Sequence, residues 1–245
     1  MLKLIEIYKY LDSISPFSMQ ESWDNSGLLI GNMQSSIKDI YLTLEVTKEL
    51  SLNVKEDSLI ISHHPLIFKA LSKLDFLDYP SNIIEILVKK NISLIAMHTN
   101  FDTTHLNKYF VEKILGFDDY SMAGIACIVE SKLTFDDLLK KFSYPIRYSK
   151  CKDFIQKIAI VCGSGISEIE SIYKEYNIDC IITGDVKYHD VMKFKSLGIS
   201  IIDANHYHSE CFFGEVLSPY LKDISYNAII FDLENPFSIK RNENE

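Results

Sequence analysis

Four apolar runs in this chain each end in polar residues, and this recurrence limits the folds open to the sequence. The runs are LIIS before HHP, ISLIAM before HTNFD, CIIT before GDVKYHD and ISIIDA before NHYHSE. Short apolar runs that alternate with helical patterns predict βαβ units and a largely parallel sheet. Ligands of such sheets bind at the carboxyl ends of the strands. The sequence therefore predicts an α/β fold whose functional site lies where these polar residues follow the strands.

The length of 245 residues allows one large domain or two modest ones. Residues 121–200 have strands and helices of their own, among them AGIACIVE, KIAIVCG and a helix near LTFDDLLKKF. We therefore expect a first α/β lobe from residues 1–120 and 201–245, which carries the candidate ligands, and a second α/β lobe from residues 121–200. Helical patterns are also expected at SNIIEILVKKN, at FFGEVLSPYL and at DVMKFKSLG, the last ending at Gly198.

Composition excludes several classes of protein. The chain has 25 Lys and Arg against 34 Asp and Glu, so its net charge of -9 argues against binding to nucleic acid or anionic lipid. No run approaches 18 apolar residues, and the N-terminus lacks the apolar region of a signal peptide. We therefore expect no membrane association and a cytoplasmic location. The five widely spaced cysteines, without a C-x-x-C pair, resemble buried apolar residues in a reducing compartment.

Two adjacent histidines, His63 and His64, follow the LIIS run and precede Pro65. Neighbouring side chains of a regular strand point to opposite faces, so the pair would not readily share one ion there. At a strand end followed by a turn, each histidine could instead serve an ion of its own. The doublet favours two metals, and the alternative is that one histidine packs in the core while the other is solvated.

Further histidines and carboxylates follow two other strands. His98 and Asp102 come after ISLIAM, and His206, His208 and Glu210 come after ISIIDA. A spacing of four residues places His98 with Asp102, and His206 with Glu210, on one side of a helical turn. Imidazole and carboxylate without thiolate favour zinc, manganese, iron, cobalt or nickel over copper(I). Two such divalent metal ions can lower the pKa of bound water toward about 7, which suits hydrolysis.

Weaker signals leave alternatives open. Gly163 and Gly165 in VCGSGIS predict either a tight turn or backbone amides that bind an anion. Asp185 either lines a cleft that faces the metals or caps a helix. His189 either lines the same cleft or lies on the surface.

Two aromatic side chains are expected to be structural. His105 has no strand end of its own and is expected on a helix surface. Trp23, the only tryptophan, is expected to pack in the core beside a turn built on Asn25 and Gly27.

Five ordered motifs together resemble a known family: ESWDNSGLLIG, SHHPLIF, HTNFD, ITGDVKYH and DANHYHSE. They are similar to those of the GTP cyclohydrolase 1 type 2 homologs, the Ngg-interacting-factor-like or YbgI-like dinuclear-metal family. The resemblance runs from about Glu21 to Glu210 and continues to the terminal NPF. It implies two interwoven α/β lobes with a dinuclear metal site in the cleft between them, and a ring-shaped homohexamer (toroid). The metal ligands that it implies are His63, His64, Asp102, His206 and Glu210.

The resemblance also suggests roles for nearby residues. His98 becomes a flanking residue, either a partner of a ligand or a proton-transfer group beside metal-bound water, and His208 is the second candidate for assisting that water. Two positions depart from the family pattern. Asn205 stands where the family usually has Gly, and Glu45 stands where an Asp often ends the strand.

Three functions are compatible with these features. The first is a metal-dependent hydrolase that acts on a nucleotide or related small molecule, for example by opening the guanine ring of GTP. The second is a metal-binding insertase, chaperone or regulatory scaffold without catalytic turnover. The third, binding of nucleic acid or protein by the ring, has little support because of the negative net charge.

Overall fold

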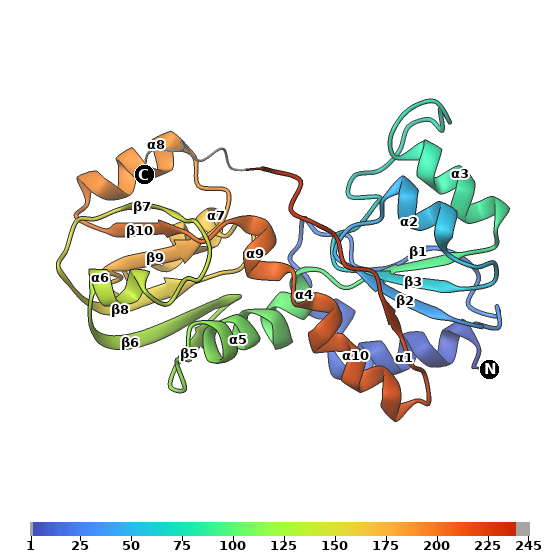
Figure 1. The fold of residues 1–245 in the computed structure, drawn as a ribbon, viewed down its shortest axis with the longest axis horizontal. Coiled ribbons are helices and arrows are strands. Elements are labelled where there is room, and N and C mark those ends of the chain that lie inside the picture. The colour runs from blue at the N-terminus through green and yellow to red at the C-terminus, as the bar shows by residue number, and fades with distance from the viewer. Residues whose placement is uncertain (1, 239–245) are drawn as a thin grey trace.

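The computed structural model describes residues 2–238, and Figure 1 shows them folded into two α/β lobes. The first lobe lies on the right of Figure 1 and the second on the left, and helical segments join them. Each lobe is built on one β-sheet. The expected fold class of two interwoven α/β lobes is confirmed.

The first sheet has the strand order β1-β4-β3-β2-β11. Its strands are β1 (Gly27–Ile30), β2 (Ile40–Thr43), β3 (Leu59–Ser62), β4 (Ser93–Ala96) and β11 (Ile229–Ile230). All neighbours are parallel except β1, which runs antiparallel to β4. The helices of this lobe are α1 (Leu4–Ile14), α2 (Lys48–Asn53), α3 (Ser81–Lys89), α10 (Phe213–Asp223) and the 3-10 turn η1 (Phe17–Met19).

Both faces of the first sheet are covered. Leu59 and Ile61 of β3 belong to a core shared with α1 and α10, whereas Ile60 belongs to a core shared with α2 and α3. A strand buried on both faces is apolar along its whole length, which is why LIIS reads as an unbroken run.

The second sheet has the order β5-β6-β8-β9-β10-β7. Its strands are β5 (Ser121–Ala123), β6 (Ala126–Thr134), β7 (Arg147–Ser149), β8 (Phe154–Ile160), β9 (Cys180–Thr183) and β10 (Ser200–Asp203). The helices are α6 (Phe135–Leu139), α7 (Ile166–Ile172) and α8 (Tyr188–Ser196). Only β8, β9 and β10 are parallel to one another. The expected largely parallel sheet is therefore found in the first lobe, while the antiparallel pairs β5–β6, β6–β8 and β7–β10 make the second sheet mixed.

The expected boundary at residue 201 is misplaced by a few residues. It falls inside β10, which pairs with β9 and β7 and so belongs wholly to the second sheet. The chain returns to the first lobe after Asp203, through the helix α9 (His206–Glu210). The ISIIDA sequence does not reveal to which sheet this strand belongs, because a strand buried on both faces has the same apolar pattern in either sheet.

Two helical segments cross between the lobes. The first consists of α4 (Thr99–Phe101), the π-helical η2 (Asp102–Leu106), α5 (Asn107–Tyr109) and the π-helical η3 (Phe110–Ile114). Leu106 packs in the core of the first lobe and Phe110 in that of the second. The second crossing runs from α9 into α10, and Phe212 between them contacts both cores. Figure 1 shows both crossings in the middle of the molecule.

Two predicted helices and two aromatic side chains show how local predictions compare with the structure. The helices expected at SNIIEILVKKN and DVMKFKSLG are α3 and α8, and Gly198 follows α8 with a φ of 72°, as expected of a glycine at a helix end. The prediction for Trp23 was wrong, because this side chain is 50% exposed. His105 is not a plain surface residue, since its ring stacks on Phe101 at a centroid distance of 4.8 Å.

The cysteines follow the expectation in part. All five are free. Three are buried and two are partly exposed; the buried ones are Cys127, Cys162 and Cys180, and the others are Cys151 and Cys211.

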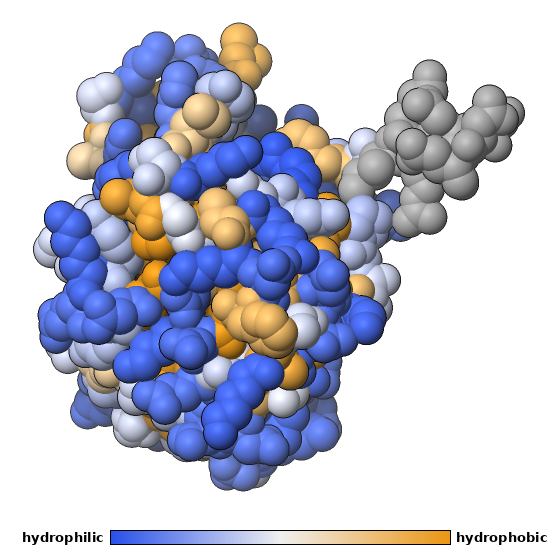
Figure 2. All heavy atoms as spheres, turned by 90° about the vertical axis from the view of Figure 1, so that its left-hand side faces the viewer, coloured by the Kyte–Doolittle hydropathy of each residue, from blue (hydrophilic) through white to orange (hydrophobic). Residues whose placement is uncertain are grey.

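None of the helices within residues 2–238 is long and apolar enough to cross a membrane. Figure 2 views the molecule from the side of the second lobe and shows mainly hydrophilic residues with scattered apolar ones. Scattered apolar side chains are normal on a protein surface.

The Asn107 side chain joins the first crossing to the second lobe and provides a test of this connection. It is fully buried, its amide donates to the carbonyl of Ile125 over 3.0 Å, and its oxygen accepts from the amide of Cys162 over 2.6 Å. The substitution Asn107→Ala leaves both backbone groups unpaired, so we expect urea denaturation to show a loss of about 2–4 kcal/mol in the free energy of unfolding. The control Asn32→Ala, at an exposed turn, should change it by less than about 0.5 kcal/mol. Equal losses in the two variants would contradict this role.

Candidate metal centre

The two lobes bring five of the predicted residues together. His63 and His64 directly follow β3, and Asp102 begins the π-helical turn η2 after β4. His206 and Glu210 lie four residues apart on α9, so they share one side of the helix. The five residues that the resemblance implied as ligands therefore meet, although they come from three remote parts of the chain.

Glu210 lies between two sets of side chains. Its Oε1 is 3.7 Å from Nε2 of His63, and this Nε2 is 3.4 Å from Oδ1 of Asp102. Its Oε2 is 3.1 Å from Nε2 of His64 and 2.9 Å from Nε2 of His206. We call the set of His63, Asp102 and Glu210 the inner position, and the set of His64, His206 and Glu210 the outer position. The ligand atoms of each set lie within 4.8 Å of one another.

The inner position fits a cation. His63, Asp102 and Glu210 are all buried, at 0%, 5% and 2% exposure. Nε2 of His63 and Oδ1 of Asp102 are buried without a hydrogen-bond partner. Unpaired buried polar atoms are unfavourable, and a metal ion at their meeting point would satisfy them. Imidazole and carboxylate groups are suitable ligands for a divalent transition metal. These residues could therefore hold metal ions.

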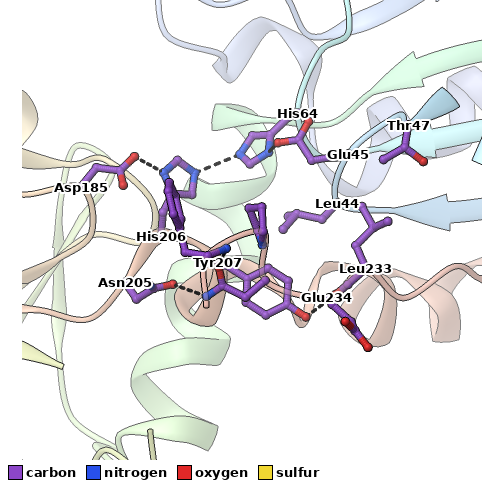
Figure 3. A pocket seen from close by; sticks show the side chains of 13 residues that line it. Leu44, Glu45, Thr47, His64, Asp185, Asn205, His206, Tyr207, Leu233 and Glu234 are labelled. Atoms are coloured by element: carbon purple, nitrogen blue, oxygen red, sulfur yellow. Dashed lines mark hydrogen bonds and ion pairs between the residues drawn. The ribbon is translucent and has the colours of Figure 1, made fainter. Parts of the chain in front are cut away.

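The rings of the three histidines that are candidate ligands are each held by a hydrogen bond of Nδ1. Each Nδ1 contacts an oxygen: the carbonyl of Met97 at 2.9 Å from His63, Glu45 at 2.6 Å from His64, and Asp185 at 2.7 Å from His206. Carbonyl and carboxylate oxygens accept hydrogen bonds, so each Nδ1 donates and each Nε2 is left to face the site, where it could bind a metal. Figure 3 shows His206 between Asp185 and His64.

The structure also decides between the alternatives for Asp185 and for His189. Asp185 lines the site and orients His206, while His189 is exposed on the surface. Glu45, which replaces the usual Asp, reaches His64.

The other departure from the family pattern is accommodated by the backbone. Asn205 has a φ of 63°, a value that asparagine adopts more readily than most residues. Its Oδ1 accepts from the amide of His208 and so caps α9. The side chain therefore adds a hydrogen bond where glycine could not.

The charges of the site depend on its burial and on Glu210. Burial acts to raise the pKa of Glu210, but His64 and His206 hold it well below its usual value. Burial acts to lower the pKa of both histidines, yet Glu210 raises that of His64 to about 10 and that of His206 to about 9. Burial, with Glu210, raises the pKa of Asp102 to about 8, while burial lowers that of His63. Without metals, protons on these groups thus offset the negative charge of the buried carboxylates, and metal binding must displace these protons.

His98 lies beside the ligands and is held by Asp24, which the sequence analysis missed. A ring nitrogen of His98 lies within 4.8 Å of those of His63 and His64. Its Nδ1 is 2.7 Å from Oδ1 of Asp24, whose side chain has 0% exposure. Burial acts to raise the pKa of Asp24, but His98 and Thr99 hold it well below its usual range. Asp24 is therefore an ionised carboxylate that orients the His98 ring. The ESWDNSG motif was interpreted only as a turn, so its carboxylate was overlooked.

His208 does not join the cluster. Residues two apart on a helix point in widely different directions, and His208 therefore faces away from the side shared by His206 and Glu210. Its ring stacks on Tyr144 at a centroid distance of 4.1 Å, and its Nδ1 contacts Asn205. The prediction that His208 assists the reacting water has no support from this geometry, and only His98 is carried forward.

The VCGSGIS turn is needed for packing rather than for an anion. The amide of Gly163 donates to Ser209 and that of Gly165 donates to Thr183, so both are already paired. Gly163 has a φ of 62°, and a Cβ atom there would lie 2.1 Å from Oε1 of Glu210. Glycine thus lets Glu210 reach the centre of the site.

Comparisons with known proteins agree with this picture. The family model of Duf34/NIF3 (NGG1p interacting factor 3) matches residues 2–238. A Helicobacter pylori (strain J99) protein named GTP cyclohydrolase 1 type 2 is 45% identical over 240 residues, or 96% of this chain and 98% of the relative. A Campylobacter jejuni protein named GTP cyclohydrolase 1 type 2 homolog is 44% identical over 242 residues, or 96% and 99%. The crystal structure of Staphylococcus aureus protein SA1388 has a TM-score of 0.84 at 27% identity and covers 98% of this chain and 99% of its own. With the five motifs in place and the fold shared, the chain belongs to the Duf34/NIF3 (NGG1p interacting factor 3) family.

Proposed function

We propose that this protein is a hydrolase that uses two divalent metal ions and acts on a nucleotide or a related small molecule. The observation that carries the proposal is Glu210, whose two carboxylate oxygens reach separate sets of histidine ligands. The name GTP cyclohydrolase 1 type 2 of a relative agrees with a nucleotide-related substrate. The metal is one of zinc, manganese, iron, cobalt or nickel. The ring-shaped homohexamer and the cytoplasmic location remain predictions.

Each of these residues has a proposed role in binding metal or accepting a proton. His63 and Asp102 would hold one ion, His64 and His206 the other, and Glu210 would contact both. Two ions in these positions would supply positive charge that acidifies water and polarises the bond to be broken. His98 lies beside the ligands without belonging to either position, so it is placed to accept the proton that the attacking water loses.

The first test combines metal content with turnover. Protein loaded with each candidate metal should hold two ions per chain, and a guanine-containing compound should release formate if water attacks C8 of its ring. Glu210→Gln keeps the shape but removes the charge, so elemental analysis should show loss of both ions, with turnover reduced at least about 100-fold. The control His208→Ala should retain two ions and full turnover. Two ions without turnover of nucleobases, nucleosides, nucleotides, esters or amides would refute the hydrolase.

A second test concerns Asp24, which acts through His98. Asp24→Asn removes the charge that orients the ring, so we expect kcat to fall about 10–100-fold while elemental analysis still finds two ions. His98→Ala should cause a similar or larger loss.

The double variant separates positioning from general destabilisation. If Asp24 acts only through His98, Asp24→Asn combined with His98→Ala should be no slower than His98→Ala alone. Additive losses would show that Asp24 acts by another route.

Metal handling without turnover is the second candidate, and the unequal burial of the two positions favours it. The His63 side chain is fully buried, whereas that of His206 is 32% exposed. An ion in the outer position would therefore exchange with solvent more readily than one in the inner position. A protein that delivers or stores metal needs such an exchangeable ion.

Stepwise removal of metal tests this asymmetry. Loaded protein treated with a chelator, desalted at intervals and analysed for metal should lose its ions in two separate phases, because the ligands of the outer position are more exposed to solvent. His206→Ala should lack the fast phase and retain one ion. Loss of both ions in a single phase would contradict the asymmetry.

A further inference from the structure

The metal centre opens into two cavities. One, of about 420 Å³, lies between His64, His206 and the chain segment of residues 233–237, and Figure 3 shows its lining. The other, of about 340 Å³, is lined by His98, by the ligands Asp102 and Glu210 and by Trp23. We call the second one the Trp23 cavity. Of these two cavities, the Trp23 cavity is the one that His98 lines, so it is where a substrate would meet the proposed proton acceptor.

Two exposed aromatic rings line the Trp23 cavity. Trp23 is 50% exposed and Phe68 is 42% exposed, and their ring centroids are 5.9 Å apart. The ring of His98 lies 6.0 Å from that of Trp23 and 6.4 Å from that of Phe68. Large aromatic side chains that are exposed together beside a polar site offer flat surfaces for a ligand to stack on.

The lining of the Trp23 cavity is acidic. Beyond the ligands Asp102 and Glu210 it includes Glu168 of the second lobe. Neither cavity has a Lys or Arg among its lining residues, within the part of the chain that the structure describes. Phosphate groups are normally bound by Arg or Lys. Phosphates that extend beyond the metal ions would therefore face Glu168 with no positive side chain to compensate.

The size of the cavity limits the ligand as well. A volume of about 340 Å³ is at the lower end of the range of roughly 300–1,000 Å³ for ligand pockets. It suits a group of the size of a nucleobase or nucleoside.

We infer that the substrate presents an uncharged or cationic planar heterocycle, such as a nucleobase or nucleoside, which packs between the rings of Trp23 and Phe68, inclined at 57° to each other, beside the metal centre. A nucleoside triphosphate is disfavoured, because phosphates that extend beyond the metal ions would meet Glu168 and no Lys or Arg among the lining residues described. This inference rests on the proposed function, since it names the substrate class of the same site. It concerns binding, however, and is testable without turnover.

Trp23 itself provides the readout, because it is the only tryptophan in the chain. Metal-loaded full-length protein is titrated with guanosine and with GTP at equal ionic strength. We expect guanosine to change the tryptophan fluorescence and to bind at least about ten-fold more tightly than GTP. GTP binding that equals or exceeds that of guanosine would overturn the inference. Binding seen by calorimetry without any change in fluorescence would also overturn it.

Variants test the stacking surface and the charge separately. Trp23→Ala and Phe68→Ala should each weaken guanosine binding about 5–100-fold in calorimetry, because each removes one stacking face. Trp23→Phe retains an aromatic face and should bind within about three-fold of the unchanged protein. Phe154→Ala, at an aromatic residue that is 69% exposed and absent from both cavities, should have no effect.

The charge variant is Glu168→Gln. It should strengthen GTP binding several-fold and leave guanosine binding unchanged, because it removes repulsion without altering the stacking surface. Unchanged GTP binding would refute the electrostatic part of the inference.

The outcomes distinguish this inference from the proposed function. Guanosine binding that depends on Trp23 and Phe68, without turnover of any compound, would refute the hydrolase and leave the stacking surface intact. Turnover that is unaffected by Trp23→Ala and Phe68→Ala would support the hydrolase and refute the stacking surface.

Discussion

The contact of one buried carboxylate with three histidine side chains is the interaction on which the rest of the structure depends. Glu210 meets His63 through one oxygen and meets His64 and His206 through the other. Because it is 2% exposed, its charge has to be offset inside the protein. Protons on the neighbouring groups or metal ions can do this, and the histidine rings, held by their Nδ1 atoms, are already oriented for metals.

The fold supports this contact by bringing distant segments to one place. Asp102 belongs to the helical crossing that leaves the first lobe, and Glu210 belongs to the crossing that returns. Each crossing packs in the cores of both lobes, which keeps the ligands in register. Gly163 completes the arrangement from the second lobe, since a side chain there would collide with Glu210. The site is thus a product of both lobes, although most of its ligands come from the first.

The surroundings of the ligands separate the proposed roles. On one side, Asp24 orients His98 in a cavity with exposed aromatic rings, which suits chemistry on a flat molecule. On the other side, His206 is partly exposed to solvent, which suits exchange of an ion. The proposed hydrolysis and metal handling would therefore use different parts of one centre, and the absence of Lys and Arg from the described lining of both cavities would restrict the ligands of both.

Several features of this protein were determined by the sequence alone. Apolar runs that end in histidine predicted buried strands with a site at their carboxyl ends, and the four-residue spacing of His206 and Glu210 placed both on one side of a helix. These patterns are local, so they are visible in the chain. Only the tertiary structure decided that β10 belongs to the second sheet, that Asp24 orients His98 across 74 residues and that Trp23 faces a cavity. Such facts depend on which segments meet in space, and residue spacing carries no record of contacts between segments so far apart.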